Sequence, residues 1–104
     1  ASSMARTKAE LGLAIVREKQ KRPAEAVRHY ANVFYEKNVK PGEPLDFVSI
    51  KEAGLAIARL SQEQQRWSEA ENVYQRMRSM FPSMRKTLTA RLDELKKVRE
   101  TPVN

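Results

Sequence analysis

Residues 12–30 read GLAIVREKQKRPAEAVRHY, and residues 54–74 read GLAIARLSQEQQRWSEAENVY. Both stretches begin with Gly-Leu-Ala-Ile, continue through a polar run, and contain Glu-Ala followed four residues later by Tyr. A helical unit that is used twice indicates a repeat architecture. Proteins built from such units present extended surfaces to partners, so the repetition bears on function as well as on fold.

The composition is that of one small helical domain. The chain has 104 residues, 3 Gly and 5 Pro, and 32% of its residues are charged, which is typical of exposed helices with one buried stripe each. It has no cysteine, so neither a disulfide scaffold nor a thiolate metal site is possible. No signal peptide is visible, and no apolar run approaches the roughly 18 residues of a membrane span. We therefore expect a cytoplasmic protein.

The net charge of +7 is unevenly distributed along the chain. Residues 1–42 and residues 83–104 are basic, whereas residues 43–82 are nearly neutral. Such ends attract acidic proteins, nucleic acids or anionic membranes, but a solvated helical surface is the preferred interpretation. No aromatic residue is interleaved with the basic residues of the last segment, so it lacks the stacking platform of single-strand binders. Nucleic acid is therefore an unlikely partner.

Apolar residues recur at steps of three and four along five segments, which predicts five helices. They cover residues 5–20, 23–37, 45–64, 67–81 and 84–99. Asp46 is a candidate N-cap, and Ser49 with Glu52 and Ser68 with Glu71 have capping-box spacing. The third helix has these predicted inward residues: Phe47, Ile50, Gly54, Ile57, Ala58 and Ser61. The first helix has this predicted apolar face: Leu11, Ala14 and Ile15, with the neighbouring Leu13 and Val16.

The unit ending at Pro82 resembles a tetratricopeptide repeat. The residues that match the family's pattern and spacing are Ala58, Trp67, Ala70, Tyr74, Met77 and Pro82. The first unit is a weaker copy. It matches at Ala14, Ala26, Tyr30 and Val33, but Pro23 replaces the turn aromatic and Asn38 stands where Pro is expected. Ala26 and Ala70 are 44 residues apart, whereas the family's period is about 34, so we expect an extended loop between the two pairs.

The resemblance implies an all-α fold in which antiparallel helix pairs stack as a right-handed superhelix. The expected segments are a cloning remnant with a disordered start (1–6), a first helix pair (7–40), a Pro/Gly loop (41–46), a second pair (47–82), a capping helix (83–99) and a frayed tail (100–104). The start at Ala1 also suggests a piece of a longer protein. A terminal helix with a polar outer face is what a helical stack requires.

In this family the first helix of each pair lines a concave groove that binds partner peptides. Carried over by position, the resemblance implies these groove residues: Lys8, Leu11, Ile15, Glu18, Lys19, Glu52, Leu55, Arg59, Gln62 and Glu63. The Lys and Asn carboxylate clamp of some family members is not reproduced. A groove that mixes Leu, Ile and Arg suits an apolar segment or a partner helix. Packing of Leu11, Ile15 and Leu55 against a neighbouring repeat is an equally good interpretation.

No catalytic motif is present. His29 is the only histidine, and a single His without Cys cannot build a usual zinc site. Neither a nucleophile elbow nor a phosphate-binding glycine loop occurs. We therefore expect no enzyme and no cofactor. The leading hypothesis is an adaptor or scaffold that binds another protein. The alternatives are a self-association module of a larger repeat protein and a basic nucleic-acid-binding accessory domain.

Overall fold

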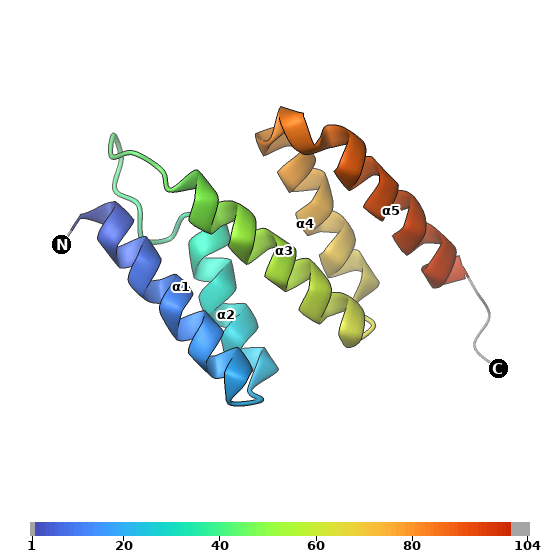
Figure 1. Ribbon diagram of the computed structural model, residues 1–104, viewed down its shortest axis with the longest axis horizontal. Coiled ribbons are helices and arrows are strands. Elements are labelled where there is room, and N and C mark those ends of the chain that lie inside the picture. Colours follow the sequence, from blue (N-terminus) through green and yellow to red (C-terminus); the bar gives the residue numbers. More distant parts are fainter. Residues whose placement is uncertain (1, 101–104) are drawn as a thin grey trace.

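The computed structural model describes residues 2–100, in which every secondary-structure element is a helix. The elements are α1 (Ser3–Lys19), α2 (Pro23–Phe34), α3 (Phe47–Glu63), α4 (Trp67–Met80), the short 3-10 helix η1 (Pro82–Met84) and α5 (Arg85–Glu100). Consecutive α-helices run antiparallel, and each packs against the next (Figure 1). The predicted all-α class, with two antiparallel pairs and a terminal helix, is confirmed.

The α1–α2 turn and the α3–α4 turn have the same backbone conformation. In each, the second residue after the helix is left-handed: Lys21 has φ 61° and Gln65 has φ 58°. The next amide, of Arg22 or Arg66, donates to the carbonyl five residues earlier, at 3.0 and 2.7 Å. This is the Schellman motif, which satisfies carbonyls at a helix C-terminus. Equivalent positions in the two pairs are therefore 44 residues apart.

The repeated sequence motif does not follow this structural register. Gly12 and Gly54 begin the two Gly-Leu-Ala-Ile copies but are only 42 residues apart. Apart from its chain neighbours and the backbone of α1 itself, no atom lies within 4 Å of a Cβ built on Gly12. A Cβ on Gly54, in contrast, would lie 2.7 Å from both the Met77 sulfur and the Phe34 ring. The two glycines have different environments, and the structural counterpart of Gly12 is Ala56.

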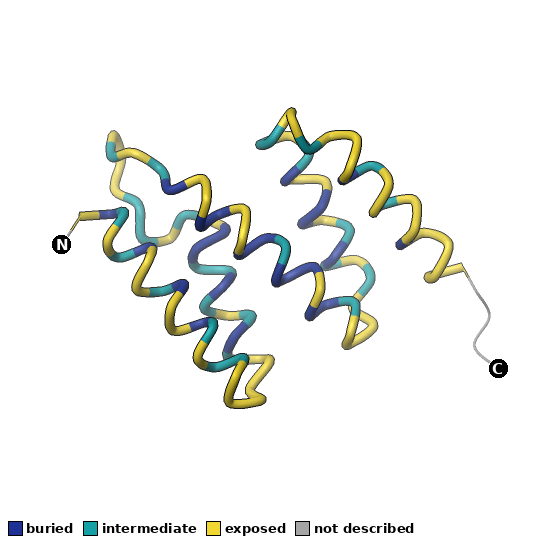
Figure 2. The backbone as a smooth tube through the Cα atoms, viewed as in Figure 1, coloured by how far each residue is buried: buried dark blue, intermediate teal, exposed yellow. Residues whose placement is uncertain are grey.

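The core is a continuous layer between the helices (Figure 2). Every α-helix contributes to it, with these side chains among the most buried: Ala14, Phe34, Ile50, Ile57, Met77 and Leu88. At its upper edge, the Arg76 guanidinium lies over the rings of Phe34 and Tyr35, at 5.7 and 5.2 Å from their centroids. The same guanidinium is 3.4 Å from the Glu36 carboxylate. These contacts fasten the end of α2 to α4.

The connection between α2 and α3, residues 35–46, folds back onto the N-terminus of α1 (Figure 1). Ser3 Oγ donates to the Glu43 carboxylate at 2.6 Å and accepts from the Lys40 amide at 3.0 Å. The Arg6 guanidinium donates to the Asn38 carbonyl at 3.3 Å. Ser3 is consequently buried. The expected disordered start over residues 1–6 is wrong for Ser3 onward, because α1 begins there and the loop covers it.

Several predicted boundaries differ from the structure. α2 ends at Phe34 instead of Lys37, because Glu36 adopts a left-handed φ of 59° that ends the helix. The surplus residues between the pairs therefore lie in the 35–46 connection and not in a longer second helix. α5 extends to Glu100, so the predicted frayed tail over 100–104 is wrong at its first residue; residues 101–104 lie outside the described part of the chain.

Of the helix-cap predictions at Asp46 and Ser68, the first is confirmed and the second is wrong. The Asp46 N-cap is confirmed, because its carboxylate accepts from the Ser49 amide at 3.1 Å and from the Ser49 hydroxyl at 2.7 Å. The capping box at Ser68 is wrong. The N-cap of α4 is Arg66, which makes no side-chain cap hydrogen bond. Since the Schellman turn leads directly into α4, the helix begins at Trp67 and Ser68 is already inside its first turn.

Three residues predicted to face inward are exposed. Leu13 and Val16 are 44% and 46% exposed, because α2 covers a different face of α1. Phe47 is 51% exposed and makes an edge-to-face contact with Phe81, with 6.2 Å between ring centroids. The other predicted inward residues of α3 are buried.

Candidate functional site: a groove between α3 and α5

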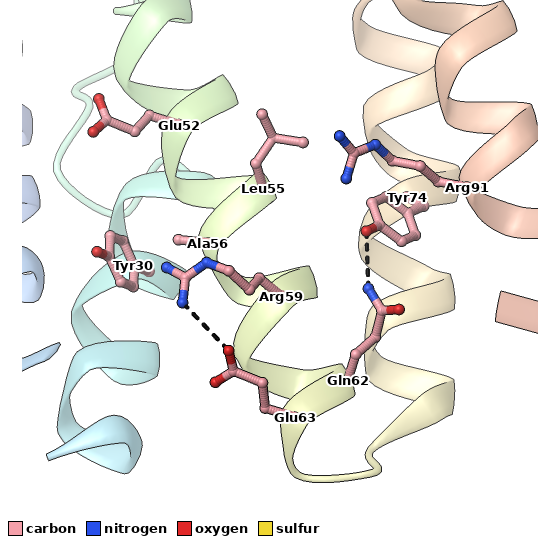
Figure 3. Close-up of a pocket in the computed structure, with 9 residues that line it drawn as sticks. All are labelled: Tyr30, Glu52, Leu55, Ala56, Arg59, Gln62, Glu63, Tyr74 and Arg91. Atoms are coloured by element: carbon pink, nitrogen blue, oxygen red, sulfur yellow. Dashed lines mark hydrogen bonds and ion pairs between the residues drawn. The ribbon is translucent and has the colours of Figure 1, made fainter. Parts of the chain in front are cut away.

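An open groove of about 550 Å³ lies between α3 and α5 (Figure 3). Its lining comes from four helices: Tyr30, Glu52, Leu55, Ala56, Arg59, Gln62, Glu63, Tyr74 and Arg91. Leu55 projects from α3 into the opening, and Arg91 extends from α5 toward it. The groove thus combines a central apolar side chain with hydrogen-bonding groups on both walls, which is the usual make-up of a binding site.

The groove exists because the α3 and α5 backbones do not approach each other. Within residues 2–100, α1 contacts α3 directly, whereas α3 and α5 make no such contact. Figure 1 shows α4 lying between α3 and α5. The short 3-10 helix η1 connects α4 to α5, whereas the long connection of residues 35–46 lies between the two helix pairs.

Equivalent hydrogen bonds in the two helix pairs support the groove. In the first pair, the Tyr30 hydroxyl donates to the Glu18 carboxylate at 2.8 Å. In the second pair, the Gln62 amide donates to the Tyr74 hydroxyl at 2.9 Å. Both bonds join the end of a first helix to the middle of a second helix, and their members are 44 residues apart. They fix the two tyrosines where both line the groove.

Arg59 links the two pairs across the groove's lower edge. Its guanidinium is 2.9 Å from the Glu18 carboxylate and 3.8 Å from that of Glu63. The hydrogen bonds from Arg59 and Tyr30 hold the pKa of Glu18 below its usual value, against the effect of burial. Burial and the bond to Glu18 raise the pKa of the Tyr30 phenol. The carboxylate is therefore ionised and the phenol neutral at physiological pH.

The structure brings together half of the predicted groove residues. Glu52, Leu55, Arg59, Gln62 and Glu63 all line the groove. A separate hollow of about 310 Å³ collects others: Ile15, Glu18 and Lys19, together with Lys21.

Two predicted positions line neither hollow. Leu11 is buried in the core and is 9% exposed, so its assignment to the groove is wrong; it packs inside the stack. Lys8 is exposed near Asp46, whose pKa is lowered mainly by hydrogen bonds from Ser49 and only weakly by Lys8.

Sequence reasoning missed four lining residues. Tyr30 and Tyr74 match the repeat pattern but were not predicted to line the groove; both are largely buried, and both line it. Ala56 lies beside Leu55 on the same face of α3. Arg91 is one of the basic residues of the last segment and was not predicted to line the groove. Only the angle between α3 and α5 places Arg91 in the groove, and hydrophobic periodicity carries no information about that angle.

The groove continues along α4 and α5. A second hollow of about 670 Å³ shares Gln62, Tyr74 and Arg91 with the first and adds Lys86, Thr87, Ala90 and Glu94. The combined surface therefore extends from Glu52 to Glu94.

Comparisons with known proteins identify no relative: no family model, no curated protein and no solved structure matches the chain. Across residues 2–100, none of the helices has both the length and the apolar character needed to cross a membrane.

Proposed function

We propose that this domain is a protein–protein interaction module, an adaptor or scaffold, that binds a peptide or helix of another protein in the groove between α3 and α5. One observation carries the proposal: a face of the first helix that is covered in the first helix pair is uncovered in the second pair. Leu11 and Ser3 of α1 are 9% and 1% exposed, because α3 and the 35–46 connection cover them. Their counterparts Leu55 and Phe47 are half-buried and 51% exposed.

A partner segment would complete this uncovered face. An apolar side chain of the partner would contact Leu55 and the edge of Tyr74. Arg91 makes no ion pair within residues 2–100 and would donate to a carboxylate or carbonyl of the partner. Arg59 already contacts two carboxylates and would mainly keep the wall in place. Such a mixture of an apolar anchor and charged neighbours is typical of helix-in-groove recognition. The resemblance to tetratricopeptide repeats supports the same use of this face.

The test is a peptide-display selection on the native chain, after which the selected peptides are measured against the wild type and the variants. Selected peptides should shift the amide resonances of α3 and α5 in the labelled protein. They should bind Leu55→Asp and Arg91→Glu at least about tenfold more weakly, which corresponds to about 1.4 kcal/mol.

Val98→Asp is the control, because Val98 is an exposed apolar residue that does not line the groove. Circular dichroism establishes that each variant is folded. Peptides that bind the wild type and both groove variants equally would show that this groove is not the binding site.

A further inference from the structure

A second uncovered surface lies on the opposite side of α1. It consists of Ala5, Ala9, Gly12, Leu13 and Val16, which we call the α1 outer face. All five residues are exposed, and the two large side chains, Leu13 and Val16, are 44% and 46% exposed. No helix of residues 2–100 packs on this face, since α2 and α3 contact other sides of α1.

The repeat register identifies what kind of element covers such a face. The counterparts 44 residues later are Ser49, Ala53, Ala56, Ile57 and Leu60. They are buried, with exposed fractions of 5%, 0%, 6%, 2% and 4%, because α2 and the α1–α2 turn pack on this side of α3. The two faces match in size, position by position: small residues at three positions, and branched apolar residues at the two others. The α1 outer face is therefore shaped to receive the second helix of a helix pair.

The charges beside the face identify the chemistry of that helix. Lys8 and Lys19 are exposed on one flank of the α1 outer face, and their counterparts on α3 are Glu52 and Glu63. The two acidic residues of α1 are occupied elsewhere: Glu10 binds His29, and Glu18 binds Arg59. A helix with carboxylates along its flank complements Lys8 and Lys19. A second copy of this chain would bring like charges together, given its net charge of +7.

We propose that the α1 outer face docks an acidic amphipathic helix of a partner protein, in the way that α2 docks on α3. This surface is distinct from the groove between α3 and α5, so either proposal can fail without the other. Leu13 and Val16 would supply the apolar contact, and Ala5, Ala9 and Gly12 would let the partner backbone come close. Lys8 and Lys19 would select acidic flanks.

Two capped synthetic peptides test the proposal. Both keep the apolar positions of residues 23–34, and they differ only at the remaining positions, which carry Glu in one peptide and Lys in the other. The Glu peptide should bind and shift the amide resonances of residues 5–20 in the labelled protein. The Lys peptide should bind at least about tenfold more weakly. Binding of the Glu peptide should weaken as salt is added, because the flanking charges are exposed.

Variants of the face complete the test. Leu13→Lys and Val16→Lys should each weaken binding of the Glu peptide about tenfold or more and leave the melting temperature nearly unchanged, since both side chains are exposed. Val98→Lys is the control, because Val98 is an apolar residue of α5 that is 51% exposed. Resonance shifts confined to Leu55 and Arg91, or equal binding of the two peptides, would overturn the proposal. A concentration-dependent dimer that Leu13→Lys abolishes would also overturn it, by assigning the face to a second copy.

Discussion

At the scale of single residues, small side chains decide how closely the helices approach. Gly54 lies where α2, α3 and α4 meet, and its missing Cβ leaves room for the Phe34 ring and the Met77 sulfur. Gly12 has the same place in the sequence motif but faces open space. A residue's role in this stack is therefore set by the structural register and not by the local sequence around it.

Alanine substitutions at the two glycines should have opposite effects. Gly12→Ala should stabilise the fold by about 0.5–1 kcal/mol, because alanine restricts the unfolded chain and favours a helix. Gly54→Ala gains the same helical preference, but its Cβ would lie 2.7 Å from two side chains. Overpacking should make it destabilising by about 1–2 kcal/mol. Urea unfolding monitored by circular dichroism measures both values; stabilisation by Gly54→Ala would show that Phe34 and Met77 move aside at little cost.

Ser61 offers a second prediction at this scale. It is 1% exposed, and its hydroxyl is the one buried side-chain oxygen or nitrogen within residues 2–100 that has no hydrogen-bond partner. Ser61→Ala removes an unsatisfied polar group and should raise the free energy of unfolding by about 1 kcal/mol. The control is Ser79→Ala on the exposed side of α4, which should gain only about 0.5 kcal/mol from helix propensity. A loss of stability in Ser61→Ala would mean that this hydroxyl does form a hydrogen bond.

At the scale of elements, the turns are the most regular part of the repeat. Two residues after the end of α1, α2 and α3 the chain has a residue with positive φ. These residues are Lys21, Glu36 and Gln65, although glycine is preferred at this position. The sequence therefore gives no glycine signal for these helix ends, which is why the end of α2 was predicted three residues too late. The hydrogen bonds of the Schellman motif compensate for the unfavourable backbone conformation.

Replacing Gln65 by glycine tests this account. Gln65→Gly should stabilise the domain by about 0.5–1 kcal/mol, because the left-handed conformation costs glycine nothing sterically. Its neighbour Gln64 has φ −96°, a value that any residue adopts easily. Gln64→Gly should therefore be neutral or destabilising by up to about 1 kcal/mol. The urea concentrations at the unfolding midpoints of the two variants measure this difference. An equal change of midpoint in both variants would contradict the account.

At the scale of the whole molecule, the five helices form a thin layer whose Cα atoms span 50 × 33 × 16 Å. Hydrophobic periodicity was sufficient to predict these helices and most of the buried positions, and the resemblance to tetratricopeptide repeats implied their antiparallel order. It was insufficient for contacts between distant segments. The Glu18–Arg59 bond joins residues 41 positions apart, and Ser3 and Glu43 are 40 positions apart. Such contacts depend on crossing angles and on the path of the 35–46 connection, as does the entry of Arg91 into the groove.

Four carboxylates make these long-range or capping contacts, and all have a lowered pKa: Glu10, Glu18, Glu43 and Asp46. The native state therefore binds fewer protons than the unfolded state in mildly acidic solution. Their contribution to stability is complete above the unfolded pKa values, near 4.5 for Glu and 3.8 for Asp, and is lost as the pH falls below these values through the folded ones. We expect the free energy of unfolding to fall steeply below about pH 4.5 and to change little on account of these groups from pH 6 to 8.

Glu18→Gln tests whether the contact between the helix pairs carries part of this dependence. At pH 7 the variant should be less stable than the wild type by roughly 1 kcal/mol, a small value because Arg59 is 48% exposed. The difference should shrink as the pH falls below 4.5, since protonation of Glu18 in the wild type removes the same ion pair. Glu94→Gln, at an exposed carboxylate of α5, should follow the wild-type curve throughout. A difference between Glu18→Gln and the wild type that stays constant down to pH 3 would contradict this account, because packing and not charge would then hold α1 against α3.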